Sequence, residues 1–140
     1  MPSTFPLTIA TQQGPVFVGE VASLRAPGVE GSFGVLPRHA AMIAQLGVGH
    51  IALTLPDRTK RILATSGGIC EVSETGVVIL ADACEAADEI DTARAEAAAQ
   101  RARERLAEAR QDRKIDASRA ELALTRALNR LRIIEKHHHA

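Results

Sequence analysis

VVILADACEAADEIDTARAEAAA, residues 77–99, changes from a strand-like to a helix-like pattern near its middle. Its first five residues are almost all large aliphatic residues, which is typical of a short buried strand. Its last eight are rich in alanine, the residue with the highest intrinsic preference for an α-helix. The acidic residues between them suit a helix N-terminus, where the helix dipole favours negative charge. We therefore expect a β-type unit before about residue 86 and a helical unit after it.

The residues before this boundary have the composition of short strands joined by tight turns. All ten glycines and all six prolines of the chain lie at or before Gly76. Alternating apolar and polar residues predict strands at 5–9 and 50–55, with turns at 56–57 and 74–76. Gly67-Gly68 interrupts another strand, which indicates a bulge or a close approach of two backbones. Many short strands at this spacing predict a sandwich or barrel.

The residues after the boundary predict two helices. The first is expected to start near 86–89 and to run to about Arg110, with a polar break at 111–114. Asp116 or Ser118 is expected to cap the second helix. Its apolar stripe, with spacings of three and four, contains Ala120, Leu124, Ala127, Leu128, Leu131 and Ile134. The first helix offers mostly alanine, so we expect a hairpin whose folded state is only marginally favoured.

Arginines occupy one face of each predicted helix, at about 100° per residue. The faces carry Arg94 and Arg101 beside Ile90 in the first helix, and Arg119, Arg126 and Arg130 in the second. A planar guanidinium suits phosphate oxygens, so the two faces would converge on an anion if the helices form a hairpin. Asp91, next to them, can accept hydrogen bonds from a base or a sugar. The alternative interpretation is a set of solvated surface charges.

The composition excludes several classes of protein. Basic and acidic residues number 17 each in 140 residues, and a chain without net charge gives no reason to expect nucleic acid as a partner. We expect no transmembrane helix, because no apolar run approaches about 18 residues, and no secretory signal, because the N-terminus lacks a basic start followed by a long apolar stretch. Hydrophobic residues make up 46%, enough for a core. Cys70 and Cys84 lack ligand-like spacing, so we expect buried thiols and no metal site.

No catalytic arrangement is evident in the sequence. The glycines at 28–34 lack the Gly-Lys-Ser/Thr ending of a phosphate-binding loop. His39 lies in an expected loop and His50 in an expected strand, and neither has a nucleophile and a carboxylate nearby in sequence. We expect a protein that is not an enzyme, and a hydrolase using His39 or His50 is the alternative. Residues 137–140 are expected to form a disordered tail.

Several separated patches resemble one protein family, in the same order along the chain. They are EGSFGVLPRH at 30–39, GVG at 47–49, SGGI at 66–69 with VVILA at 77–81, IDTARA at 90–95 and TRALNRL at 125–131. Together they are similar to the epsilon subunit of bacterial rotary F-type ATP synthases, over roughly residues 5–134. The chain departs from that family at 40–43 and at Val48, where proline or leucine is frequent. A second copy of the 90–95 pattern, IDASRA, occurs at 115–120.

This resemblance implies an N-terminal antiparallel β-sandwich, residues 1–86, followed by a C-terminal two-helix antiparallel hairpin, residues 87–136. The sandwich would dock on the gamma subunit and the membrane-embedded c-ring as part of the central stalk, which couples ion translocation to ATP synthesis. The implied rotor contacts are Glu30, Gly31, Gly34, His39 and Met42. The subunit would be non-catalytic and peripheral, at the cytoplasmic face of the cell inner membrane.

The resemblance gives the hairpin a regulatory role. Extended, its helices would reach the alpha/beta catalytic hexamer and inhibit ATP hydrolysis; folded back, they would release the enzyme. No cofactor would be required, and ATP would be a regulatory ligand of the folded hairpin. The implied ATP ligands are Glu85, Ile90, Asp91, Arg94, Arg101, Arg126 and Arg130. A ligand bound only by the compact state stabilises it by about 2.7 kcal/mol at one hundred times its Kd, enough to shift a marginal hairpin. The alternative is a free-standing nucleotide-binding regulator.

Overall fold

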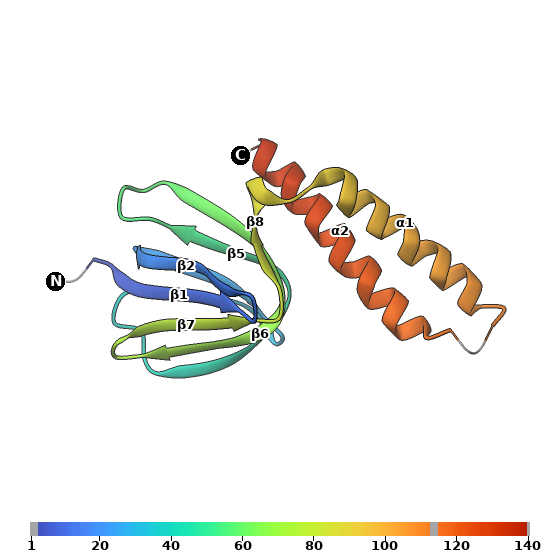
Figure 1. Cartoon of the computed structure of the whole chain (residues 1–140). Helices are drawn as coiled ribbons and strands as arrows, with labels where there is room; N and C mark the ends of the chain where they lie inside the picture. The colour runs from blue at the N-terminus through green and yellow to red at the C-terminus, as the bar shows by residue number, and fades with distance from the viewer. Residues whose placement is uncertain (1–2, 113–114, 140) are drawn as a thin grey trace. The chain divides into compact units, whose positions relative to one another are not determined.

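The computed structural model describes residues 3–112 and 115–139, and the chain divides into two compact units, Met1–Ala87 and Asp88–Ala140 (Figure 1). The strands are β1 (Phe5–Thr11), β2 (Gly14–Val21), β3 (Ser23–Gly28), β4 (Gly31–Val35), β5 (Met42–Thr54), β6 (Lys60–Ser73), β7 (Gly76–Ala81) and β8 (Cys84–Ala86). They are followed by a short 3₁₀ helix, η1 (Ala87–Glu89), and by helices α1 (Thr92–Ala109) and α2 (Ala117–His139).

The strands form one sheet with the hydrogen-bonded order β2-β1-β7-β6-β5-β3-β4, and β8 pairs with β6. The fold therefore confirms the predicted β unit followed by a two-helix hairpin. Most neighbouring strands are antiparallel, but β1 and β7 run parallel, with Leu7 opposite Val77. Alternation along one strand does not reveal this pairing, because it depends on how distant parts of the chain pack.

The core of the strand unit lies between the inner faces of its strands. The most deeply buried large side chains there are Leu7, Ile9, Val21, Leu24, Val35, Ile51, Leu53, Cys70 and Ile79. Strand β7 shows the alternation clearly, since Val77, Ile79 and Ala81 are buried while Val78 and Leu80 are exposed. Both faces of β7 are thus apolar, although only one of them faces the core.

Strands β5 and β6 stay paired over almost their whole length. The GVG stretch at 47–49, which resembles a turn, lies inside β5 instead, because Leu46 and Val48 pair with Gly68 and Ser66 of β6. Gly67 and Gly68 have φ values of +80° and +129°, and a Cβ on Gly68 would collide with the Leu80 carbonyl. This confirms the predicted close approach of two backbones at the double glycine.

Helix α1 begins at Thr92, later than the expected 86–89, because Asp91 is its N-cap. The Asp91 Oδ1 atom accepts a hydrogen bond from Arg94 N at 3.1 Å, and residues 87–89 form η1 instead. Asp116 has the equivalent role in α2, where its Oδ1 accepts from Arg119 N at 3.1 Å. Asp116 therefore caps α2, as one of the two expected alternatives.

Helices α1 and α2 pack against each other as the predicted antiparallel hairpin (Figure 1). The small buried residues of the two helices, here called the alanine seam, are Ala95, Ala99, Ala102, Ala120 and Ala127. Of the other stripe residues predicted in α2, Ile134 is buried, and Leu124, Leu128 and Leu131 are half-buried. Alanines let the helices approach closely, but each buries little apolar area.

Helix α2 continues to His139, where a disordered tail was expected from residue 137. No glycine or proline follows Gly76, so no residue of this segment stops a helix. Residue 140 of that expected tail and residues 113–114 of the expected break lie outside the described residues. Within 3–112 and 115–139, no helix is long and apolar enough to cross a membrane.

Candidate functional site

Large apolar side chains gather on the outer face of the sheet, away from the core. They are Val18, Ile43, Ile69, Val78 and Leu80, with exposed fractions between 42% and 76%, and we call them the apolar outer patch. They come from β2 and from the consecutive strands β5, β6 and β7, which the sheet brings to one side through β1.

The strand register makes Ile69, Val78 and Leu80 neighbours, whereas Thr8 separates Val18 from Val78 and the exposed Glu71 separates Ile43 from Val78. One row across the outer face contains Val18, Thr8, Val78, Glu71 and Ile43. In the next row Leu80 pairs directly with Ile69. Adjacent strands lie about 4.8 Å apart, so side chains in neighbouring rows and strands are within reach of one another. A group of apolar side chains on an exposed face is typical of an interaction surface.

None of the implied rotor contacts is a member of this patch. Glu30 is exposed in the β3–β4 turn, Gly31 begins β4 with a φ of +134°, and Gly34 is exposed in the same strand. Met42 packs against the core, whereas its neighbour Ile43 is 76% exposed. Sequence reasoning missed the patch, because an apolar side chain on an outer face looks the same in sequence as one on an inner face.

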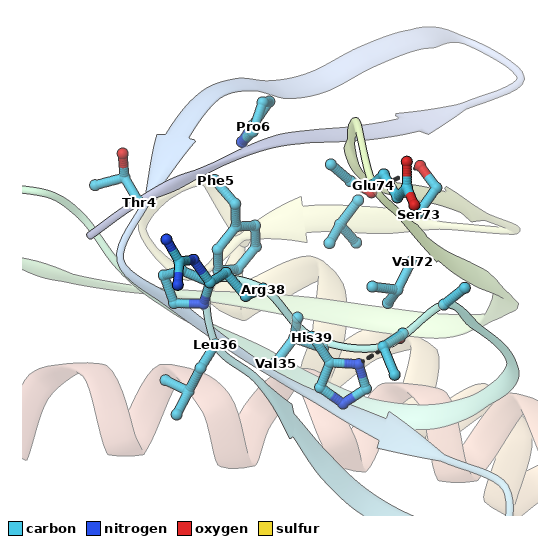
Figure 2. A pocket seen from close by; sticks show the side chains of 15 residues that line it. Thr4, Phe5, Pro6, Val35, Leu36, Arg38, His39, Val72, Ser73 and Glu74 are labelled. Carbon is cyan, nitrogen blue, oxygen red and sulfur yellow. Dashed lines mark hydrogen bonds between the residues drawn. The ribbon is translucent and has the colours of Figure 1, made fainter. Parts of the chain in front are cut away.

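His39 lines a cavity of about 590 Å³ between the start of β1, the β4–β5 loop and the β6–β7 turn (Figure 2). Four core side chains contribute to its lining, namely Phe5, Val35, Val72 and Val77. Arg38, Ser73 and Glu74 add polar groups. The His39 Nδ1 atom donates a hydrogen bond to the Ala40 carbonyl at 2.7 Å, so the proton of a neutral ring is on Nδ1.

The cavity does not have the geometry of a hydrolase site, although Ser73 and Glu74 line it as well as His39. Ser73 Oγ donates to the Gly76 carbonyl at 3.3 Å and lies 3.0 Å from Thr75 Oγ1. Among the described residues no hydrogen bond joins His39 to Ser73 or Glu74. A nucleophile needs a base within hydrogen-bonding distance, so this arrangement gives no support to the hydrolase alternative.

The two cysteines are held as neutral thiols. Burial raises the pKa of Cys70 to about 11. Burial, with a smaller contribution from the charge of Glu85, raises the pKa of Cys84 to about 12. The thiolate, not the neutral thiol, is the nucleophile and the metal ligand. With raised pKa values, both side chains are therefore poor nucleophiles and poor metal ligands at neutral pH. Among residues 3–112 and 115–139, no group of three or more metal-ligating side chains is found.

The arginines predicted to bind an anion lie on one side of the hairpin. Around α1, Arg94 and Arg101 are about 100° from the alanine seam, and around α2, Arg126 and Arg130 are turned from it by a similar angle. Because the helices are antiparallel, these two rotations bring the arginines to the same side. Helical periodicity therefore turns the two arginine faces to the same side of the hairpin.

A groove of about 640 Å³ on this side joins the two helices. Its charged lining is balanced, with three arginines (Arg101, Arg105 and Arg119) and three acidic residues (Glu104, Glu108 and Asp116). Arg105 Nη1 lies 3.6 Å from Glu108 Oε2, so this arginine fits the interpretation as a solvated surface charge with a neighbouring partner.

The remaining implied ATP ligands occupy different environments. Arg126 is half-buried, and its Nε atom has no hydrogen-bond partner among the described residues. Arg94 is exposed, Ile90 is buried, and Asp91 uses one carboxylate oxygen as the α1 cap. Glu85 lies on β8 in the strand unit. The structure thus brings Arg101 together with Arg119 in one groove, and keeps Arg94, Arg126 and Arg130 on the same side of the hairpin.

Comparison with known protein families gives one consistent match to each unit. A family model described as the beta-sandwich domain of the ATP synthase delta/epsilon chain matches residues 4–87. A second, described as the long alpha-helix domain of the same chain, matches residues 88–135.

Individual relatives agree with the family models. The ATP synthase epsilon chain of Pelotomaculum thermopropionicum is 50% identical over 101 residues, which cover 72% of this chain and 75% of the relative. That of Desulforamulus reducens is 41% identical over 135 residues, covering 96% and 100%. Among solved structures, a chain of the Euglena gracilis mitochondrial ATP synthase, OSCP/F1/c-ring in rotational state 1, matches with a TM-score of 0.78 and 26% identity. The match covers 92% of this chain and 80% of that one.

Proposed function

We propose a function from one premise: this chain belongs to the delta/epsilon chain family of ATP synthase, as an epsilon chain and hence as a non-catalytic subunit. In the proposal the chain is part of the central stalk, and its strand unit docks on the gamma subunit and on the c-ring. It would then turn with the rotor and help couple ion translocation to ATP synthesis. Through these partners it would be held peripherally at the cytoplasmic face of the inner membrane.

The apolar outer patch is the observation that carries the docking proposal. The strand unit already has a complete core, so the outer side chains are not needed to form one. Covering apolar surface with a partner is favourable, by about 25 cal/mol per Å². We assign the patch to the gamma subunit, with Ile43 as the outward residue next to Met42. His39 would lie toward the same subunit, and the turn at Glu30–Gly34 would face the c-ring.

Binding of the full chain to purified gamma subunit tests this assignment. The substitutions Ile43→Glu and Leu80→Glu place a charge in the patch and should weaken binding by about 30-fold or more, the range of an interface hot spot. Leu122→Glu is the matched control, because Leu122 is an exposed leucine on α2, outside the sheet. Equal affinities for all three variants and the parent chain would reject the patch as the docking surface.

A second proposed function is control of ATP hydrolysis by the hairpin. The folded hairpin would bind ATP, and the ligands implied by the resemblance are Glu85, Ile90, Asp91, Arg94, Arg101, Arg126 and Arg130. The extended helices would contact the alpha/beta hexamer and inhibit hydrolysis. The observation that favours this role is the Arg126 Nε atom, which is buried and has no hydrogen-bond partner among the described residues, on the side of the hairpin to which helical periodicity turns the other arginines. A guanidinium is well suited to bind phosphate oxygens.

Titration of the isolated chain with ATP tests the ligand. ATP should raise the melting temperature of the hairpin, and Arg94→Gln should reduce that effect. Arg103→Gln is the matched control, because Arg103 is an exposed arginine of α1 about half a turn away from Arg94 and Arg101. A flat response of the parent chain up to millimolar ATP rejects the ligand.

Deletion of residues 87–136 tests the inhibitory role in a reconstituted complex. ATP hydrolysis should rise when the helices are absent, while the strand unit remains bound. Unchanged hydrolysis would reject inhibition and leave the docking proposal standing. Copurification of the full chain with the membrane ATP synthase separates this reading from the free-standing nucleotide-binding regulator, which would not copurify.

A further inference from the structure

The turn between β5 and β6 concentrates the positive charge of the strand unit. Residues 57–61, here called the basic turn, read DRTKR and contain Arg58, Lys60 and Arg61. The rest of the unit, residues 1–56 and 62–87, contains two basic residues and six acidic ones. The basic turn is therefore a local positive site on a unit that is otherwise acidic.

Hydrogen bonds fix the conformation of this turn. The Leu55 amide donates to the Thr59 carbonyl at 2.8 Å, and the Arg58 amide donates to the Leu55 carbonyl at 2.9 Å. Asp57 Oδ1 accepts from the Thr59 hydroxyl at 2.6 Å and from the Thr59 amide at 3.0 Å. These bonds to Thr59 lower the pKa of Asp57, so its carboxylate is ionised at neutral pH and is occupied within the turn.

The three basic side chains are open to a partner. Arg58, Lys60 and Arg61 are all exposed. Within residues 3–112 and 115–139, none of them forms an ion pair or a side-chain hydrogen bond. The turn thus presents three cations to the solvent, with one carboxylate that is already used by Thr59.

Arg58 occupies a backbone position that does not favour arginine. Its φ is +74°, in the left-handed region where glycine and asparagine are preferred. Strain of this kind is concentrated at functional sites, where a particular side chain is needed. Asparagine would suit the turn better and lacks the charge, so the turn itself gives no reason for an arginine here.

The basic turn is separate from the surfaces assigned above. It follows Thr54, which pairs with Ser23 at the start of β3, whereas the turn at Glu30 follows the end of that strand. Along β6, Lys60 lies nine residues before Ile69 of the apolar outer patch, about 30 Å of strand. A partner at the basic turn therefore makes a contact different from those of the outer patch and of the turn at Glu30.

The charges fit an acidic protein segment better than a membrane or a nucleic acid. Recruitment to anionic lipids takes clusters of about four to eight basic residues, and the basic turn has three. The whole chain has no net charge, so it provides no long-range attraction to a polyanion. Three cations within four successive residues match two or three carboxylates of one loop or helix, and an arginine can bind a carboxylate through two parallel hydrogen bonds.

We propose that the basic turn docks on an acidic segment of a neighbouring subunit in the ATP synthase. The proposal rests on the proposed place of the chain in that complex. Arg58, Lys60 and Arg61 pair with Asp or Glu side chains of that segment. Because exposed ion pairs are weak individually, this contact orients the strand unit and speeds its association, while the apolar outer patch supplies more of the affinity.

Binding of the full chain to purified ATP synthase from which this subunit has been removed tests the contact. Replacing Arg58, Lys60 and Arg61 together by glutamine should weaken binding about tenfold at about 50 mM salt, from about two- to three-fold for each ion pair. At about 500 mM salt the variant and the parent chain should agree within about two-fold, because salt screens exposed charges.

A matched pair of single substitutions separates the charge from the fold. Arg58→Asn should weaken binding about two- to three-fold without lowering the melting temperature, since asparagine is tolerated at positive φ. Arg25→Asn removes the same charge from an exposed arginine of β3 outside the turn, and it should bind like the parent chain.

Lys60 allows the partner to be identified, because it is the only lysine of the strand unit. A carbodiimide joins a lysine amine to a carboxylate in contact with it. Treatment of the assembled complex should therefore link Lys60 to an Asp or Glu of another subunit, which mass spectrometry identifies. Lys60→Arg keeps the charge, so it should bind like the parent chain and lose this link.

The outcomes distinguish this contact from the proposed function. If the parent chain does not bind the complex, the proposed function fails and the contact fails with it. If the parent chain binds but the glutamine variant binds equally well at low salt, or Lys60 forms no link, only the contact is overturned. Phosphatidylglycerol vesicles that bind the parent chain and not the glutamine variant would assign the basic turn to a membrane, which also overturns the proposal.

Discussion

Ile69 of β6 is paired directly with Leu80 of β7, and both side chains lie on the outer face of the sheet, 52% and 60% exposed. The next pair along the same two strands, Cys70 and Ile79, lies on the inner face and is fully buried. Apolar side chains thus occupy both faces of these strands, while only the inner ones pack in the core. The two faces should therefore respond very differently to the same substitution.

Replacing Leu80 by threonine should change the free energy of unfolding of the strand unit by no more than about 0.5 kcal/mol, because the side chain is largely in water. Ile79→Thr should cost about 3 kcal/mol or more, since it leaves a cavity and buries a hydroxyl. Urea unfolding followed through the NMR signals of β6 and β7 measures both. Equal losses of unfolding free energy would mean that Leu80 is covered within the chain, and the apolar outer patch would then not be an exposed surface.

Glycine substitutions should separate backbone strain from steric collision. Gly14 and Gly68 have similar positive φ values, +125° and +129°, but a Cβ on Gly14 would meet nothing within 4 Å. On Gly68 it would collide with the backbone of Leu80 and Ala81. Gly14→Ala should therefore cost about 1–2 kcal/mol from strain alone.

Gly68→Ala should cost at least about 2 kcal/mol more than that, because β7 must move away from β6 as well. Thermal unfolding of the two variants gives the comparison, and the parent chain gives the reference. If Gly68→Ala is as mild as Gly14→Ala, the pairing of β6 and β7 is looser than the structure indicates, and the double glycine is not required for it.

The sequence predicted the elements better than their partners and boundaries. Strands, tight turns and a hairpin of helices follow from local patterns and were confirmed, but β5 and β6, with 13 and 14 residues, are much longer than the short strands predicted. The parallel pairing of β1 with β7 was not predictable, because it joins segments about seventy residues apart. The helix start was misplaced because the acidic residues at 88–89 suit a helix N-terminus as well as Asp91 does, and only the hydrogen bond to Arg94 N distinguishes them.

The candidate sites were predictable to different degrees. The arginine faces followed from helical periodicity and lie on one side of the hairpin, because a helix has a fixed angle per residue. The apolar outer patch was not found, since Met42 and Ile43 are both apolar neighbours and the sequence does not say which of them faces the core. Strand register, which depends on the whole sheet, decides that point.

Both cysteines should be unreactive in the native chain. At pH 8 the thiols are protonated, because burial raises the pKa of Cys70 to about 11 and that of Cys84 to about 12, and only the thiolate attacks an alkylating reagent. Iodoacetamide should label them only after urea is added. A native chain labelled at the rate of a free thiol would show that the strand unit opens locally.

The same pKa values predict the direction in which the stability of the strand unit changes at high pH. In the unfolded chain the thiols lose their protons near pH 9, below their folded values, so the unfolded state is favoured as pH rises above 9. The stability of the strand unit should therefore fall between about pH 9 and 11, and replacing both cysteines with alanine should reduce that fall. A pH-independent stability in this range would contradict the raised values.

The alanine seam should control how readily the hairpin opens. Ala127 of α2 is fully buried, so Ala127→Leu forces a larger side chain between α1 and α2, and overpacking of this kind costs about 1–3 kcal/mol. Because ATP is proposed to bind only the folded hairpin, this cost should appear as an apparent affinity for ATP lowered by about 5- to 150-fold.

Ala107→Leu is the matched control, since Ala107 is exposed on α1 and leucine is also a good helix former. NMR spectra of the strand unit should be the same in both variants and the parent chain, because its core is built from its own residues. An unchanged ATP affinity in Ala127→Leu would mean that the seam does not have to close for the ligand to bind, and a hairpin that opens and closes could not then be the sensor.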